Sequence, residues 1–169
     1  LAKQKKLKIR AYLSCVLGCP YEGNIDTSKV ATLCSALYEM GADEISLGDT
    51  IGVGTPKITQ ELIKQVIKKV PVDNIAMQFH NTYGQAIANI YASLECGINK
   101  FDSAVAGLGG CPYAKGATGN VATEDVLYLM QGLDITTNVD LVKLAHVGKF
   151  ICDKLERKNN SLVGSALLN

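Results

Sequence analysis

Short apolar segments alternate with amphipathic helical segments along nearly the whole chain, and this alternation constrains the fold more than any other feature. Four segments have the length and apolar content of buried strands: residues 8–16, 44–47, 75–79 and 100–105. Between them, residues 27–40, 58–69 and 84–96 repeat apolar side chains at helical spacing. Strands that alternate with helices in this way form parallel βαβ units.

Two further helices, predicted at residues 123–130 and 140–155, follow the fourth strand. The predicted fold class is therefore α/β, as a single domain over residues 1–169. Four βα units fit either a small doubly wound sheet or half of a (β/α)8 barrel. Both architectures bind ligands at the carboxyl ends of the strands, and the Gly-rich and polar clusters of this sequence follow the predicted strands.

The composition argues against several kinds of partner. A formal net charge of +1 gives no electrostatic attraction to nucleic acid or to an acidic membrane surface. No apolar run approaches the roughly 18 residues of a membrane span. The six cysteines form no CxxC pair, so neither a disulfide framework nor a structural zinc site is expected. The chain begins with leucine, which suggests a processed chain, a trimmed sequence or a fragment.

The segment of residues 104–120 is rich in glycine, so its backbone is free to move and to approach a ligand closely. Cys111 lies at its centre. A thiol in an exposed loop is a candidate proton donor or acceptor, and the alternative is a small loop residue without chemistry. The glycine spacing matches neither a Walker motif nor a Rossmann fingerprint.

Two strand ends carry polar candidates. His80 follows the strand of residues 75–79, where it is either a metal ligand, an acid–base group or a packed side chain. Asp49 follows the strand of residues 44–47. A carboxylate there either binds a metal, takes a proton or caps the next turn.

Several segments together resemble the hydroxymethylglutaryl-CoA lyases. The segment at residues 107–114 reads Gly-Leu-Gly-Gly-Cys-Pro-Tyr-Ala and is similar to the signature loop of that family, with Cys111 at the position of its cysteine. Further similar segments are Ser-Cys-Val-Leu-Gly-Cys-Pro-Tyr-Glu-Gly at 14–23, Glu-Ile-Ser-Leu-Gly-Asp-Thr-Ile-Gly-Val-Gly-Thr-Pro at 44–56, His-Asn-Thr-Tyr-Gly-Gln at 80–85 and Gly-Asn-Val-Ala-Thr-Glu-Asp at 119–125. The cysteine loop distinguishes the lyases from related synthases.

The resemblance implies a metal-dependent TIM barrel, of which this sequence would carry strands five to eight and the C-terminal helices. It implies cleavage of 3-hydroxy-3-methylglutaryl-CoA to acetyl-CoA and acetoacetate with Mg²⁺ or Mn²⁺ at the mouth of the barrel. By the same resemblance His80 and Asn120 are metal ligands, Cys111 transfers a proton, Asp49 belongs to the active site, and Glu124 lies behind the metal in its second shell.

Two residues depart from the family pattern. The metal-binding strand usually reads His-x-His, but Gln78 occupies the first position here. A glutamine oxygen is a weaker donor than imidazole, so we expect weaker metal binding or a lost ligand. Asn81 replaces a common aspartate beside His80, which affects how the histidine is oriented. The Arg and Asp of the family's first strand have no counterpart in this sequence.

The alternative hypothesis is a catalytically inactive half-barrel that acts only as an assembly unit. Such a half would leave two unpaired strand edges and an exposed apolar inner face, so it would need either the missing N-terminal half or a second copy. A homodimer and an acyl-CoA substrate are the expected partners, with no nucleic acid and no membrane. Reduced thiols fit a bacterial cytoplasm or, in a eukaryote, the mitochondrial matrix.

Overall fold

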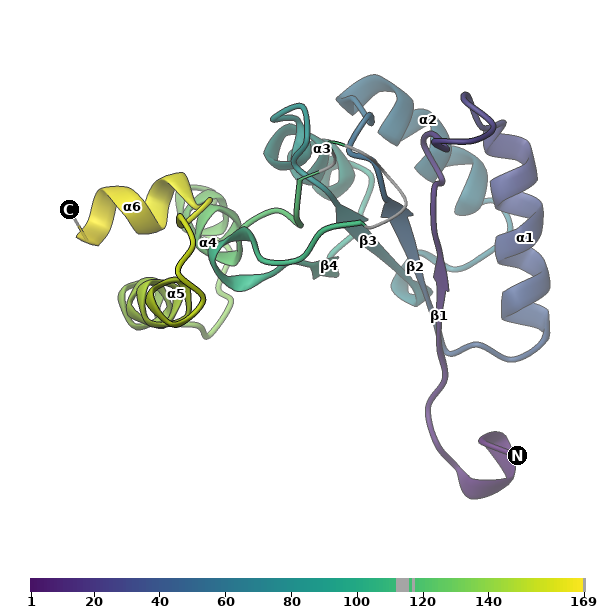
Figure 1. The fold of residues 1–169 in the computed structure, drawn as a ribbon. Coiled ribbons are helices and arrows are strands. Elements are labelled where there is room, and N and C mark those ends of the chain that lie inside the picture. Colours follow the sequence, from purple (N-terminus) through teal and green to yellow (C-terminus); the bar gives the residue numbers. More distant parts are fainter. Residues whose placement is uncertain (112–115, 117, 169) are drawn as a thin grey trace.

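The computed structural model describes residues 1–111, 116 and 118–168 and shows an α/β fold built on a four-stranded parallel sheet (Figure 1). The strands are β1 (Arg10–Leu13), β2 (Glu44–Asp49), β3 (Ile75–Phe79) and β4 (Phe101–Asp102). Their spatial order is β1-β2-β3-β4, and each neighbouring pair is parallel. The predicted fold class of an α/β chain with parallel strands is confirmed.

One helix follows each of the first three strands. These helices are α1 (Thr27–Glu39), α2 (Pro56–Val66) and α3 (Ala86–Glu95), with short 3-10 turns η1 (Lys3–Lys5), η2 (Val72–Asn74) and η3 (Val105–Gly107) elsewhere. Asp26 caps α1 by accepting a hydrogen bond from the Ser28 N–H (2.8 Å). Pro56 opens α2, where its missing N–H costs no helical hydrogen bond.

The hydrophobic core lies between the sheet and these three helices. Alternate strand residues point to the same face of a sheet, so Ile45 and Leu47 of β2 share a face with Met77 and Phe79 of β3. All four are fully buried and belong to one cluster with the apolar faces of α1, α2 and α3. This packing fixes which strand residues are left for the opposite face.

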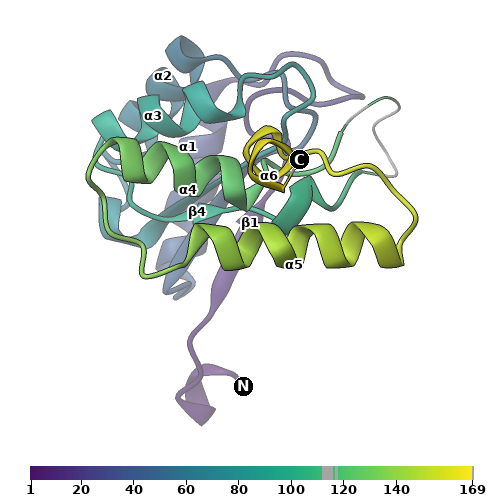
Figure 2. The same ribbon diagram turned by 90° about the vertical axis from the view of Figure 1, so that its left-hand side faces the viewer.

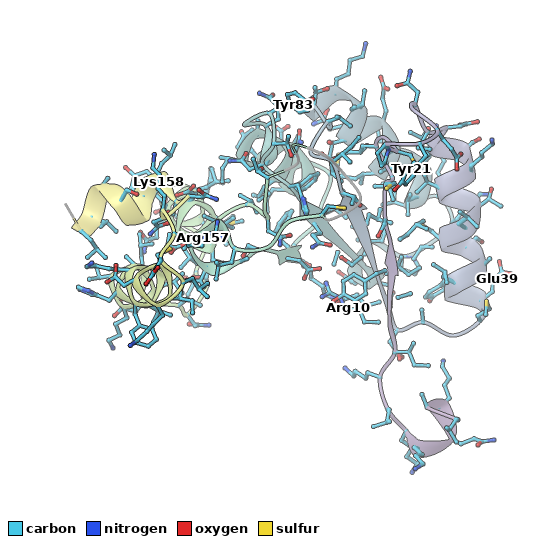
Figure 3. All side chains as sticks on the ribbon, in the orientation of Figure 1. Arg10, Tyr21, Glu39, Tyr83, Arg157 and Lys158 are labelled. Carbon is cyan, nitrogen blue, oxygen red and sulfur yellow. The ribbon has the colours of Figure 1, made fainter. Side chains whose placement is uncertain are left out.

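The opposite face of the sheet is polar, so the expectation of an exposed apolar inner face is wrong. Arg10 forms ion pairs with Glu44 (2.5 Å) and Asp102 (2.8 Å), and it reaches from β1 toward β4 (Figure 3). Lys100 pairs with Glu44 (2.7 Å), and the Ser46 hydroxyl donates to Asp102 (2.8 Å). Each charged side chain of this network has an oppositely charged partner. No unpaired charge of the network is therefore left on this partly exposed face.

The chain departs from a simple βα repeat beyond β4. There α4 (Thr123–Gly132), α5 (Leu141–Lys154) and α6 (Leu162–Leu168) form a helical unit on the far side of the molecule from α1 (Figures 1 and 2). The helix α6 was not predicted, because its seven residues are too few for a periodic signal. It is stabilised by tertiary contacts, since Asp125 accepts hydrogen bonds from the Ser161 hydroxyl (2.6 Å) and the Val163 N–H (2.9 Å). Within the described residues, none of the helices combines the length and the apolar character that crossing a membrane requires.

Two strands are shorter than predicted. The strand β1 ends at Leu13 because Cys15 adopts a left-handed backbone conformation (φ 60°) that no strand can continue through. The strand β4 ends at Asp102 because Ala104 pairs with a later segment, residues 119–123, instead of with β3. The Ala104 N–H donates to Val121 O (3.1 Å), and the Thr123 N–H donates back to Ala104 O (3.0 Å).

Candidate metal and catalytic site

The inserted segment of residues 119–123 brings the candidate site together. On its other side it bonds to the end of β3, where the Val121 N–H donates to Phe79 O (3.0 Å) and the Asn81 N–H donates to Gly119 O (3.2 Å). The segment therefore lies between the carboxyl ends of β3 and β4, with Asn120 opposite His80 in an isolated bridge. Two residues forty positions apart meet at the strand ends, as the resemblance requires.

Asn120 also contacts Gln78, which points from β3 to the polar face of the sheet. The Gln78 Nε2 donates to Asn120 Oδ1 (2.8 Å), and the Asn120 Nδ2 donates to Leu108 O (3.2 Å). A carbonyl accepts but cannot donate, so the contact with Leu108 fixes which end of the Asn120 amide faces Gln78. Gln78 thus contacts the candidate ligand through its nitrogen, and only the second lone pair of Asn120 Oδ1 is left for another partner.

His80 has the protonation state that a metal ligand needs. It is 7% exposed, and burial lowers its pKa, an effect that a hydrogen bond to the Thr118 backbone partly offsets. The imidazole is therefore neutral at pH 7. Its Nδ1 is buried and has no hydrogen-bond partner. Burying this nitrogen costs free energy unless a hydrogen-bond donor or a metal ion binds its lone pair.

The side chains of Gln78, His80 and Asn120 can provide some, but not all, of the ligands that a divalent cation needs. They comprise one neutral imidazole and two amide groups, and in the described portion of the chain no three His, Cys, Asp or Glu side chains converge on one point. Hard cations such as Mg²⁺ prefer carboxylate oxygens, and a set of neutral ligands leaves the charge of the ion uncompensated. A divalent-cation site built on these residues would therefore need a carboxylate from outside this group.

Cys111 is half-buried and follows a run of glycines that runs beside Asn120. Gly109 has a positive φ (99°), and a Cβ atom there would lie 2.6 Å from Asn120 Nδ2, so only glycine allows this approach. The predicted loop of residues 104–120 is described up to Cys111 and again at Gly116 and residues 118–120. Its other residues, 112–115 and 117, lie outside the described residues.

Asp49 lies on the helix-facing side of the sheet, the side opposite Gln78. It is fully buried, and its two carboxylate oxygens accept the N–H groups of Val53 (3.1 Å) and Gly54 (2.8 Å). Burial raises its pKa, and these hydrogen bonds oppose the rise. The geometry supports the capping alternative, in which Asp49 holds the loop after β2.

Glu124 lies in the first turn of α4 and is fully buried as well. Both of its carboxylate oxygens lie within hydrogen-bond distance of the Ala106 N–H (3.0 and 2.9 Å). Burial raises its pKa, because the charged form loses its hydration. Glu124 therefore contacts the backbone turn at Ala106, which precedes the glycine run.

A small cavity of about 210 Å³ adjoins this region, and it brings in Asn160, which sequence reasoning missed. It is lined by Asn81, Gly107, Thr118, Gly119, Asn120, Ala122 and Asn160. Asn160 comes from the connection between α5 and α6, and Asn81 also accepts the Ala86 N–H at the start of α3 (3.2 Å). No local pattern marks Asn160, because the other residues that line the cavity are distant from it in the sequence.

Comparison with known proteins places the chain among enzymes of one family. The HMGL-like family model matches residues 2–151. A 3-hydroxy-3-isohexenylglutaryl-CoA/hydroxymethylglutaryl-CoA lyase of Pseudomonas aeruginosa is 58% identical over 99% of the chain, and the mitochondrial hydroxymethylglutaryl-CoA lyase of Gallus gallus is 54% identical over 98%. The crystal structure of hydroxymethylglutaryl-CoA lyase from Pseudomonas aeruginosa superposes with a TM-score of 0.95 at 57% identity over 99% of the chain.

The chain spans about half the length of these relatives: 56% and 55% of the two sequences, and 56% of the crystallised chain. The matched residues include the whole candidate site, from Gln78 and His80 to Asn120 and Glu124. The chain belongs to the HMGL-like family.

Proposed function

We propose that this chain is the C-terminal half of a hydroxymethylglutaryl-CoA lyase, and that the complete protein cleaves 3-hydroxy-3-methylglutaryl-CoA to acetyl-CoA and acetoacetate. The observation that carries the proposal is the meeting of His80, Gln78 and Asn120 at the carboxyl ends of parallel strands, next to the glycine run that leads to Cys111. The lyase relatives, at 58% and 54% identity, support the same substrate class.

The strand order and the curvature of the sheet support the assignment of this chain to strands five to eight of a (β/α)8 barrel. The strands of the sheet follow one another in sequence order, without the reversal that marks a doubly wound sheet. In a flat sheet β1 and β4 would be about 14 Å apart, since neighbouring strands are separated by about 4.8 Å. The Arg10–Asp102 ion pair (2.8 Å) joins these two strands, which a concave sheet makes possible.

Enzymes of this family are generally dependent on a divalent metal. His80 and Asn120 would hold that ion in this chain, and the carboxylate that the site lacks would come from the first strand of the complete barrel. The bound ion, Mg²⁺ or Mn²⁺, would supply Lewis-acid stabilisation of negative charge on the substrate oxygens. Gln78 would hold Asn120 Oδ1 in place through its N–H group.

The cleavage is a retro-Claisen reaction. A base takes the proton of the tertiary hydroxyl, its oxygen forms a carbonyl, and the adjacent C–C bond breaks with its electron pair leaving on the acetyl-CoA enolate. The enolate carbon then takes a proton, which we assign to the Cys111 thiol. Asp49 supports the site indirectly by holding the loop after β2, and Glu124 supports it through the turn at Ala106.

The partners follow from the same proposal. They are an acyl-CoA substrate and the N-terminal half of the barrel, with a homodimer as the expected assembly. The lyase relatives include a bacterial and a mitochondrial protein, so the expected compartment is a bacterial cytoplasm or a mitochondrial matrix.

The test is turnover of 3-hydroxy-3-methylglutaryl-CoA by the complete protein, with Mg²⁺ or Mn²⁺ and with a chelator. Metal-dependent release of acetyl-CoA and acetoacetate is the expected result. No turnover under any metal condition, with the protein folded, would overturn the proposal in favour of a silent assembly unit. The same assay on residues 1–169 alone measures how much of the site this half supplies.

A further inference from the structure

Ala106 connects the glycine run with the C-terminal helices. Its N–H donates to Glu124, and its carbonyl accepts the Asn160 N–H (3.2 Å). Ala106 is fully buried and has a left-handed conformation (φ 54°), which is uncommon for any residue with a Cβ atom. Such a conformation persists only where the surrounding contacts enforce it.

Glu124 provides one of these contacts. Its carboxylate is fully buried, and the hydrogen bonds that it accepts come from the Ala106 N–H and from its own backbone. A buried carboxylate is expensive, so it is expected to have a specific task. Here the carboxylate is held where it fixes one turn of backbone.

Gly148 of α5 provides the space that Glu124 occupies. A Cβ atom at Gly148 would overlap Glu124 Oε1 and would lie 3.6 Å from the Ala106 Cβ. Glycine in the middle of a helix costs about 1 kcal/mol relative to alanine, so its presence there calls for a packing reason. The carboxylate of Glu124 is that reason.

The turn held in this way contacts the candidate site directly. The Leu108 N–H donates to Val105 O (3.0 Å), which closes the turn, and the Leu108 carbonyl accepts both the backbone N–H of Asn120 (3.3 Å) and its Nδ2 (3.2 Å). Cys111 follows Leu108 by three residues. The position of the turn therefore sets both a candidate metal ligand and the start of the cysteine segment.

We propose that Glu124, seated against Gly148, is a positioning residue that holds the Ala106 turn and thereby aligns Asn120 and Cys111. The C-terminal helical unit is in this view a brace for the site, joined to it through Gly148 and Asn160. The kinetic consequence rests on the proposed lyase function, whereas the positioning itself does not.

The test is Gly148→Ala in the complete protein, with Gly132→Ala as the matched control. Gly132 lies in α4 with nothing within 4 Å of an added Cβ, so its variant keeps the parent activity and gains helix propensity. Gly148→Ala displaces the carboxylate, and kcat falls about a hundredfold, as expected for a misplacement near 1 Å, while KM changes little. Site-resolved iodoacetamide labelling, followed by mass spectrometry at a temperature where both variants are folded, shows an altered rate at Cys111 alone.

The variants Glu124→Ala and Glu124→Gln add a second comparison. Glu124→Ala removes the acceptor of the Ala106 N–H and lowers kcat as Gly148→Ala does, whereas the glutamine oxygen of Glu124→Gln still accepts this N–H, so this variant retains more of kcat and of the parent labelling rate at Cys111. The proposal is overturned if Gly148→Ala matches Gly132→Ala in both measurements, or if Glu124→Gln is as impaired as Glu124→Ala. Should Cys111→Ala retain full turnover, the proton-transfer role would fall, and the labelling rates would still decide the positioning role.

Discussion

Cys111 carries the most specific chemical prediction at the scale of single residues. In the complete protein, Cys111→Ala is expected to lower kcat by a factor of about 10² to 10⁴, the usual contribution of a positioned acid or base, with KM nearly unchanged. Steady-state kinetics with 3-hydroxy-3-methylglutaryl-CoA measures both constants. Cys96→Ala, at the end of α3, is the control for loss of a half-buried thiol. Parent-like turnover by Cys111→Ala would refute the assigned role.

Gly52 and Gly84 allow backbone strain to be separated from crowding. Both have similar positive φ angles (68° and 70°), but an added Cβ at Gly52 would lie 2.8 Å from His80 O, whereas nothing lies within 4 Å at Gly84. Gly84→Ala should therefore cost about 1–2 kcal/mol of unfolding free energy from the left-handed conformation alone. Gly52→Ala should cost a further 1–3 kcal/mol or so, because the strand end at His80 must move.

Urea unfolding of the two variants beside the parent gives the comparison. If both variants lose the same unfolding free energy, the backbone at His80 moves without cost to accommodate the added methyl group. The loop after β2 would then not hold the His80 backbone in place. The midpoint shift, read at constant m-value, is the quantity to compare.

At the scale of elements, the ion-pair network across β1, β2 and β4 makes stability depend on pH. The hydrogen bond from Lys100 and the charge of Arg10 lower the pKa of Glu44. A lowered carboxyl pKa stabilises the fold above the ordinary value of about 4.3, and that stability is lost as the pH falls toward the lower folded-state value. Glu44→Gln should lose about 1 kcal/mol at pH 7, because these side chains are only partly buried, and should show a weaker decline below pH 4.5.

Unfolding free energies between pH 3 and 7 test this prediction, with Glu61→Gln as an exposed control on α2. A decline in Glu44→Gln as steep as in the parent would show that other carboxylates set the acid limit. High salt should narrow the difference between parent and variant, since partly exposed pairs are screened.

Elements with a strong period were predictable from sequence, and elements made by tertiary contacts were not. The helix α2 and the strand β3 follow directly from apolar spacing, and β3 matches its predicted bounds, residues 75–79. The seven-residue α6 depends on Asp125, which no local pattern reveals. Likewise, the early end of β4 depends on the inserted segment of residues 119–123.

The candidate site divides in the same way. The resemblance to the lyases selected His80, Asn120 and Cys111, and the structure brings the first two together. Sequence reasoning could not find the contact between Glu124 and Ala106, because the two residues lie 18 positions apart and neither belongs to a motif for such a turn. Asp49 shows the converse limit, since its strand-end position is equally compatible with a ligand and a cap.

At the scale of the whole molecule, the two sheet edges determine how the chain behaves alone. In the described part of the chain, β1 and β4 each pair with one strand only, so each presents an unpaired edge. Residues 1–169 alone should therefore sediment as a dimer or larger species at micromolar concentration. Adding the N-terminal half of the Pseudomonas aeruginosa relative should convert these into a one-to-one complex. A monodisperse 18.0 kDa monomer with cooperative unfolding would contradict this expectation.

The inserted segment gives the glycine-rich loop two fixed ends. Ala104 and Val121 are hydrogen-bonded to each other, and the neighbouring Asn120 sits in register with His80, so both boundaries are tied to the sheet. Within the loop, Leu108 and Gly109 also contact Asn120, and the Thr118 backbone contacts His80, so these three residues belong to the same frame. Cys111 lies outside that frame, so the proton donor that we propose there can be exchanged, by evolution or by protein engineering, while the residues that hold Asn120 opposite His80 stay the same.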